Sequence, residues 1–295
     1  MTKIKYEEKL LTELHEPDAS ENIKAIYEKI KHCCHVPFVA LLYRHLATYE
    51  GLLEWSWELL EPLINLAQFQ EYVDSISDID NNIVLRKSSI NERELSTLSH
   101  LDIAAIKYII ESYNAANAKN IIILYVLQSL LAKNHRDAAV AAQRPRALPE
   151  YNRIDFPLLG RPIKIDLIHP KLLAQLIKLR TNSDGEGRQI VPTMYRHLSY
   201  WPKYLMHQSK LLEPHFADGS IERVANKIRK EAQQNSIKLE THICSIQAPP
   251  RNHPHKLGNI LDQFAQTISE MIVVGQLLRI SIPVDKKPPS LAKSH

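Results

Sequence analysis

A tetrapeptide that occurs twice carries the first residues of chemical interest. Tyr43-Arg44-His45-Leu46 returns 152 residues later as Tyr195-Arg196-His197-Leu198. Histidine can act as a base near neutral pH. Because both copies hold the same residues, we favour a structural contact for the motif over a catalytic one.

Asn117 is the most informative polar residue of the first half. It lies on the apolar face of an expected helix, between Tyr113 and Ile121. A buried amide costs stability unless it is hydrogen-bonded. It therefore either ties two helices together or serves a functional site, and Asn114, one turn earlier, could share either role.

The run His32-Cys33-Cys34-His35 suggests metal binding, but its spacing argues against it. Structural zinc sites normally separate their cysteines by two to four residues. We expect buried packing cysteines and no metal. The adjacent pair and the lone Cys244 also lack the spaced redox pair that a thiol peroxidase would need.

The duplicated tetrapeptide belongs to a longer repeat that indicates helices. Its other matching positions at this spacing are Leu53 and Leu205, and Leu59-Leu60-Glu61-Pro62 and Leu211-Leu212-Glu213-Pro214. Upstream, Val36-Pro37 matches Val191-Pro192 after a three-residue slip. Each copy predicts two consecutive helices, the second ending before its proline, because proline interrupts a helix interior.

Apolar periodicity predicts further helices over most of the chain. They cover 20–33 with Ser20 as cap, Asp102 to Leu131 with Asp102 as cap, a segment after Pro170, 219–235, and Leu257 to Ile280. The predicted fold is all-α, with two similar helical halves from an internal duplication packed as one body. We expect a first repeat over 1–135, a connector over 136–165, a second repeat over 166–283 and a disordered tail over 284–295.

Composition supports a helical protein and excludes several classes. Seven glycines in 295 residues are few for the turns of a strand-rich fold. The net charge of +4 is interleaved along the chain, so no nucleic-acid partner is expected. Neither a membrane span nor a signal peptide is indicated. Three cysteines fit a reducing cytoplasm, and a homodimer is left open.

Three segments in order resemble the group I 2-haloacid dehalogenases, which act on both D and L substrates. They are Val36-Pro37-Phe38-Val39-Ala40 with Leu46-Ala47-Thr48-Tyr49-Glu50-Gly51, then Tyr113-Asn114-Ala115-Ala116-Asn117-Ala118-Lys119, then Trp201-Pro202-Lys203. The resemblance covers about residues 20–280. It implies an all-helical, duplicated fold and no cofactor.

The resemblance also implies a reaction: halide displacement from a small 2-halocarboxylic acid by an activated water, without an ester intermediate. Such a reaction needs a carboxylate base, an amide that orients the water, and a small dry pocket. The amide matches Asn117. Pocket residues match Phe38 and Leu41, the helix start that meets the substrate carboxylate matches Thr193 and Tyr195, and the residue linked to accepting both enantiomers matches Pro192.

The position of the family's catalytic Asp falls on Met194 in this chain. The thioether of methionine cannot take a proton from water. The equivalent residue of the first repeat, Leu42, is also apolar. His197 lies near the same helix face as Met194 and is a weak candidate to replace the base. Asp184 or Glu186 could approach the pocket if their loop folds back over it. We therefore expect a dehalogenase-like hydrolase acting on carbon–halide bonds, whose activity is in doubt because Met194 replaces the base. The alternative is a non-catalytic helical descendant that binds a small carboxylic acid or has a structural role.

Overall fold

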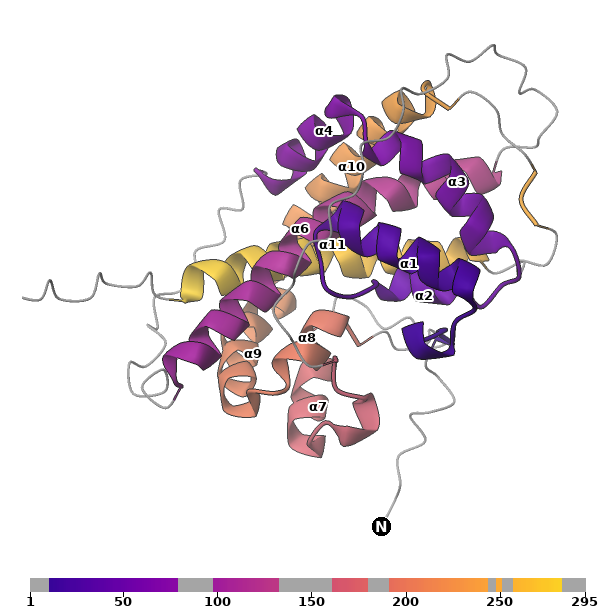
Figure 1. Cartoon of the computed structure of the whole chain (residues 1–295). Coiled ribbons are helices and arrows are strands. Elements are labelled where there is room, and N and C mark those ends of the chain that lie inside the picture. Colours follow the sequence, from indigo (N-terminus) through magenta and orange to yellow (C-terminus); the bar gives the residue numbers. More distant parts are fainter. Residues whose placement is uncertain are drawn as a thin grey trace, which may run out of the picture.

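The computed structural model describes residues 11–78, 98–132, 161–179, 191–243, 248–250 and 257–282. Every regular element in these ranges is a helix, as the sequence predicts (Figure 1). The α-helices are α1 (Glu21–Cys34), α2 (Leu41–Leu46), α3 (Leu52–Ile64), α4 (Ala67–Ser77), α6 (His100–Ala132), α7 (Pro170–Ile177), α8 (Thr193–Leu198), α9 (Pro202–Ala217), α10 (Ser220–Glu240) and α11 (Leu257–Ser281). Two short 3-10 helices, η2 (Glu16–Asp18) and η3 (Ile165–Leu167), precede α1 and α7.

Two long helices, α6 and α11, cross at the centre and carry much of the core (Figure 1). Helix α6 is long and apolar enough to span a membrane by composition, but 61% of its most apolar window is buried within the protein. Burial of this kind is typical of a core helix. The crossing is close because α11 has Gly275 where a Cβ would lie 1.8 Å from Asn114 Oδ1.

We predict that Gly275→Ala lowers the free energy of unfolding by about 1–3 kcal/mol, because overpacking forces neighbouring groups to shift. Both polar atoms of the Asn114 amide are buried without a partner among the described residues. In an Asn114→Ala background the cost of Gly275→Ala should disappear, since alanine is also the better helix former. Urea denaturation of the four proteins measures this coupling, and equal costs in both backgrounds would contradict it.

The helix ends agree with some predicted caps and correct others. Ser20 Oγ accepts a hydrogen bond from Ile23 N–H at 3.4 Å, as predicted for α1. Helix α6 begins before Asp102, however, because Ser99 Oγ accepts from Asp102 N–H at 3.1 Å while Asp102 accepts from Ser99 N–H at 2.9 Å. Asp102 thus completes a reciprocal capping box rather than capping the helix itself.

The prediction that α3 and α9 end before their prolines was wrong. Pro62 and Pro214 both lie inside their helices, which end at Ile64 and Ala217. A proline near the end of a helix removes one amide donor, but the backbone N–H groups of later residues can still form helical hydrogen bonds. Asp218 N–H donates to Pro214 O at 2.9 Å.

The two halves show the same order of elements. A 3-10 helix and three α-helices occur as η2, α1, α2 and α3 and again as η3, α7, α8 and α9. Helices α2 and α8 each have six residues and lie 152 residues apart. The internal duplication and the domain limits stay predictions; most of the expected connector and the whole tail lie outside the described residues.

Candidate functional site

A cavity of about 60 Å³ lies where α2, α6, α8 and α11 meet. This volume holds a molecule of a few heavy atoms. Its walls are mainly apolar. The lining residues are Phe38, Ala40, Leu41, Leu42, Tyr113, Ala116, Asn117, Asn120, Pro192, Thr193, Met194, Phe264, Thr267, Ile268 and Met271.

Apart from Phe38, the lining consists of two sets with the same spacing. Residues 40–42 at the start of α2 recur 152 residues later as 192–194 at the start of α8. Residues 113, 116, 117 and 120 of α6 recur 151 residues later as 264, 267, 268 and 271 of α11. The cavity therefore lies between two pairs of helices, α2 with α6 and α8 with α11, whose lining positions match at a nearly constant spacing.

The matched sets differ in chemistry, which gives the cavity one polar wall. Asn117 and Asn120 on α6 correspond to Ile268 and Met271 on α11. Asn120 Oδ1 accepts a hydrogen bond from the Tyr43 hydroxyl at 2.9 Å. The partly buried Asn117 amide makes no hydrogen bond within the described part of the chain, so it can bond to a molecule in the cavity.

The structure brings six of the eight residues singled out from the sequence to this cavity. They are Phe38, Leu41, Asn117, Pro192, Thr193 and Met194. Tyr195 and His197 do not line it. The Tyr195 side chain is fully buried, and burial raises its pKa; its hydroxyl has no partner among the described residues.

Met194 lies in the cavity wall and is only 1% exposed. No carboxylate, imidazole or amine belongs to the lining that the described residues form. Leu42, its counterpart in the first half, also lines the cavity. Asp184 and Glu186, considered above as substitutes for a base, lie outside the described residues.

His197 lies behind the cavity wall, against two aromatic rings that form it. Its Nδ1 is 3.5 Å from the Tyr113 hydroxyl, and its ring meets Phe38 edge-on at 5.6 Å. Phe38 and Tyr113 stack with their centroids 4.4 Å apart. Burial raises the pKa of Tyr113, against the opposing effect of Arg44 and Arg196, so Tyr113 stays a neutral phenol.

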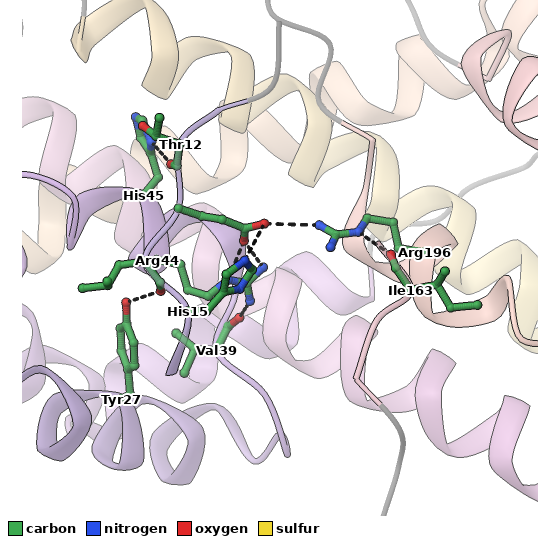
Figure 2. Close-up of polar contacts among 10 residues, drawn as sticks. Thr12, His15, Tyr27, Val39, Arg44, His45, Ile163 and Arg196 are labelled. Carbon is green, nitrogen blue, oxygen red and sulfur yellow. Dashed lines mark hydrogen bonds and ion pairs between the residues drawn. The ribbon is translucent and has the colours of Figure 1, made fainter. Parts of the chain in front are cut away.

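The arginines of the duplicated tetrapeptide meet at one carboxylate. Arg44 Nε and Nη2 each lie 2.7 Å from Glu13 Oε2. Arg196 Nη1 approaches the other carboxylate oxygen, Glu13 Oε1, at 3.6 Å (Figure 2). We call Glu13, Arg44 and Arg196 the buried charge cluster. The cluster joins the segment before α1 to both halves.

Backbone hydrogen bonds reinforce this arrangement. Arg44 O accepts from Leu14 N–H at 2.9 Å, and Arg196 O accepts from Ile163 N–H at 3.3 Å. His45 Nδ1 lies 2.7 Å from Thr12 O. In each half, then, the segment before the 3-10 helix bonds to the tetrapeptide helix, which accounts for a structural role of the motif.

The buried charge cluster predicts acid sensitivity. Burial alone would raise the pKa of Glu13, but Arg44 and Arg196 outweigh it and hold that pKa below its ordinary value. A carboxyl with a lowered pKa in the folded state stabilises above its unfolded pKa, and this stability is lost as the pH falls through the folded pKa. The stability difference between wild type and Glu13→Gln should thus be largest near neutral pH and shrink below about pH 4.5. Urea denaturation at several pH values tests this; a difference that grows in acid would contradict it.

Cys33 and Cys34 are both buried, at 7% and 2% exposure. Burial raises the pKa of Cys34 to about 12. Lys119 Nζ donates to Cys33 O at 2.7 Å near the end of α1, where a cation interacts favourably with the helix dipole. No group of three or more His, Cys, Asp or Glu side chains in the described ranges could hold a metal ion.

Sequence reasoning missed several parts of the site. Asn120 follows Asn117 by one turn on the same helix face, and this spacing could have indicated it. The α11 wall is formed by Phe264, Thr267, Ile268 and Met271, and no motif in the sequence marked these four residues. Glu13 lies before the first predicted helix, and nothing in its surroundings marks it as the partner of two distant arginines.

The chain has the all-helical fold of known 2-haloacid dehalogenases. It superposes on a D-2-haloacid dehalogenase mutant with a TM-score of 0.70 at 15% identity, over 94% of this chain and 97% of that one. It also superposes on a D-2-haloacid dehalogenase mutant in complex with D-2-CPA, with a TM-score of 0.66 at 17% identity, over 93% and 94%.

The sequence comparison agrees with the fold. The chain is 25% identical over 223 residues to a configuration-inverting 2-haloacid dehalogenase of Pseudomonas sp. (strain 113), covering 74% of this chain and 71% of that protein. No protein-family model matches. The resemblance to 2-haloacid dehalogenases is thereby confirmed.

Proposed function

We propose that this dehalogenase-like protein binds small 2-halocarboxylic acids in the cavity and displaces halide from them only slowly. The observation that carries the proposal is Met194: it lines the cavity where the resemblance places a carboxylate base.

The size and polarity of the cavity suit a small carboxylic acid. About 60 Å³ admits a short-chain acid rather than a long one. The apolar walls favour an alkyl or halogen substituent, and the Asn117 and Asn120 amides with Thr193 and Thr267 offer hydrogen bonds. A D-2-haloacid dehalogenase with the same fold forms a complex with L-LA.

The reaction implied by the resemblance makes distinct demands on this lining. A water must attack the α-carbon opposite the departing halide, and a base must take its proton. Asn117 can orient the water through its amide. Met194 cannot accept the proton, and the loss of general-base assistance typically costs about 10²–10⁴-fold in rate.

A second candidate is a hydrolase in which His197 replaces the base through Tyr113. The distance of 3.5 Å between His197 Nδ1 and the Tyr113 hydroxyl favours it. Tyr113 would accept the proton of the attacking water while passing its own to His197. His197→Asn should then abolish whatever halide release the wild type shows, whereas our first proposal predicts no change.

A binding measurement with matched amide variants tests the proposed ligand. Isothermal titration of wild type with 2-chloropropionate should show binding, and Asn117→Ala should weaken it about fivefold to tenfold, the value of one net hydrogen bond. Asn114→Ala is the control, because Asn114 lies one turn away and does not line the cavity. Equal effects of the two variants, or no binding by the wild type, would contradict the proposal.

A further inference from the structure

The buried charge cluster keeps an excess positive charge behind the cavity. The Arg44 and Arg196 side chains are each 8% exposed and the Glu13 side chain 16%. Two guanidinium groups thus face one carboxylate. His15, 3.8 Å from Glu13, is half exposed, and Lys31 of the neighbouring α1 is balanced by Glu16 at 2.9 Å. The buried charge cluster itself, with two arginines and one glutamate, carries a net charge of +1.

The cluster is linked to the cavity by Tyr113 and by the chain itself. Tyr113 lines the cavity, and both arginines act electrostatically on its hydroxyl. Each arginine also follows a lining residue by two positions, Arg44 after Leu42 and Arg196 after Met194. Arg44 also donates a hydrogen bond to Val39 O, the carbonyl between the lining residues Phe38 and Ala40.

No charged side chain of the described residues lines the cavity, so an anion inside would depend on dipoles and on nearby buried charge. At a separation on the order of 10 Å and an effective dielectric constant of about 20, one unit charge changes an anion's binding constant by about tenfold. Buried charges are also little screened by salt. The excess charge is therefore large enough to influence which ligand binds.

We propose that the buried charge cluster makes the cavity selective for a monoanionic carboxylate over its neutral analogue, with Arg196 as the specificity-determining residue. This inference rests on the proposed function, since it concerns the ligand of the same cavity. Arg196 is singled out because Glu13 contacts it at 3.6 Å through one nitrogen, but contacts Arg44 at 2.7 Å through two. The other partner of the Arg196 side chain is a carbonyl, Ile163 O at 3.0 Å, which carries no compensating full charge.

Two substitutions change the cluster charge in opposite directions, which separates electrostatics from structure. Glu13→Gln raises the net charge by one unit, and Arg196→Met lowers it by one. The experiment titrates each protein with 2-chloropropionate and with the neutral 2-chloropropionamide, and compares the ratio of the two dissociation constants. Glu13→Gln should increase the preference for the acid by about tenfold, Arg196→Met should decrease it by about tenfold, and Arg196→Lys should retain it.

The matched control is Glu61→Gln. Glu61 is a similarly buried carboxylate, with a 10% exposed side chain 3.1 Å from Lys29, and it does not line the cavity. It should leave the acid preference unchanged while testing the cost of losing a buried carboxylate. Circular dichroism checks the fold of each variant. If Arg196→Met does not fold, Glu13→Gln alone tests the inference. A cluster that only stabilises the fold would not bind the acid more tightly after its ion pair is broken.

The possible results distinguish this inference from the proposed function. Acid binding by the wild type with a preference that shifts in opposite directions in the two variants supports both. Acid binding with a preference that both variants leave unchanged or shift in the same direction overturns the inference and leaves the proposed function standing. If neither variant folds, equal affinity of the wild type for acid and amide overturns it, and a preference for the acid supports it. No binding of either ligand to the wild type overturns both.

Discussion

Replacing Met194 by Asp is expected to raise halide release from 2-chloropropionate by about 10²–10⁴-fold over the wild type. The substitution places a carboxylate in the cavity wall, where Asn117 and Thr193 already lie. The new carboxyl would be buried, so its pKa should be raised, which strengthens it as a base. Burying it should also reduce stability. Chloride release from each enantiomer is the measurement.

Two variants provide controls for this gain. Met194→Asn introduces a side chain of nearly the same shape as Asp that cannot act as a base. Its chloride release should stay as slow as that of the wild type. Leu42→Asp puts the same carboxylate at the equivalent position of the first half, which also lines the cavity. It should gain less, because position 194 is the one that the resemblance assigns to the base. A folded Met194→Asp protein that remains inert would show that the cavity has lost more than its base.

Replacing Arg44 by Met is expected to lower the free energy of unfolding by about 3–5 kcal/mol, the cost of removing one partner of a buried ion pair. Arg44 makes both short contacts to Glu13 and also donates to Val39 O, so its loss leaves Glu13 with the more distant Arg196. Urea denaturation measures the change.

The control for Arg44 is a surface ion pair. Lys24 lies 2.9 Å from Glu21, with exposed fractions of 41% and 91% for the two side chains. Lys24→Met should change stability by less than about 1 kcal/mol. If Arg44→Met costs no more than Lys24→Met, the buried charge cluster does not hold the two halves together as described.

The sequence was sufficient for the fold because helical periodicity is local. Apolar spacing predicted α6 and α11 nearly to their ends, and Ser20 was recognised as a cap. The error at Asp102 arose because a reciprocal capping box contains two good caps, and only the structure shows which one begins the helix. The helix ends predicted before Pro62 and Pro214 were wrong because tertiary packing holds both segments helical although each proline lacks one amide donor.

The candidate site was predictable only where the resemblance supplied positions. Asn117 and residues 192–194 are far apart in sequence, and no periodicity brings them together; matching them to the dehalogenases did. The α11 wall could not be predicted, because Ile268 and Met271 look like any other core residues. The partnership of Glu13 with Arg44 and Arg196 depends on how the N-terminal segment crosses both halves, which is a tertiary contact without a local signal.

The most direct test of the account follows ligand binding and chloride release in the same wild-type sample. Each enantiomer of 2-chloropropionate is titrated into the protein while chloride is measured over time. The account predicts saturable binding accompanied by chloride release far slower than in Met194→Asp. Rapid turnover by the wild type would contradict it and would show that a residue other than the one at position 194 takes the proton.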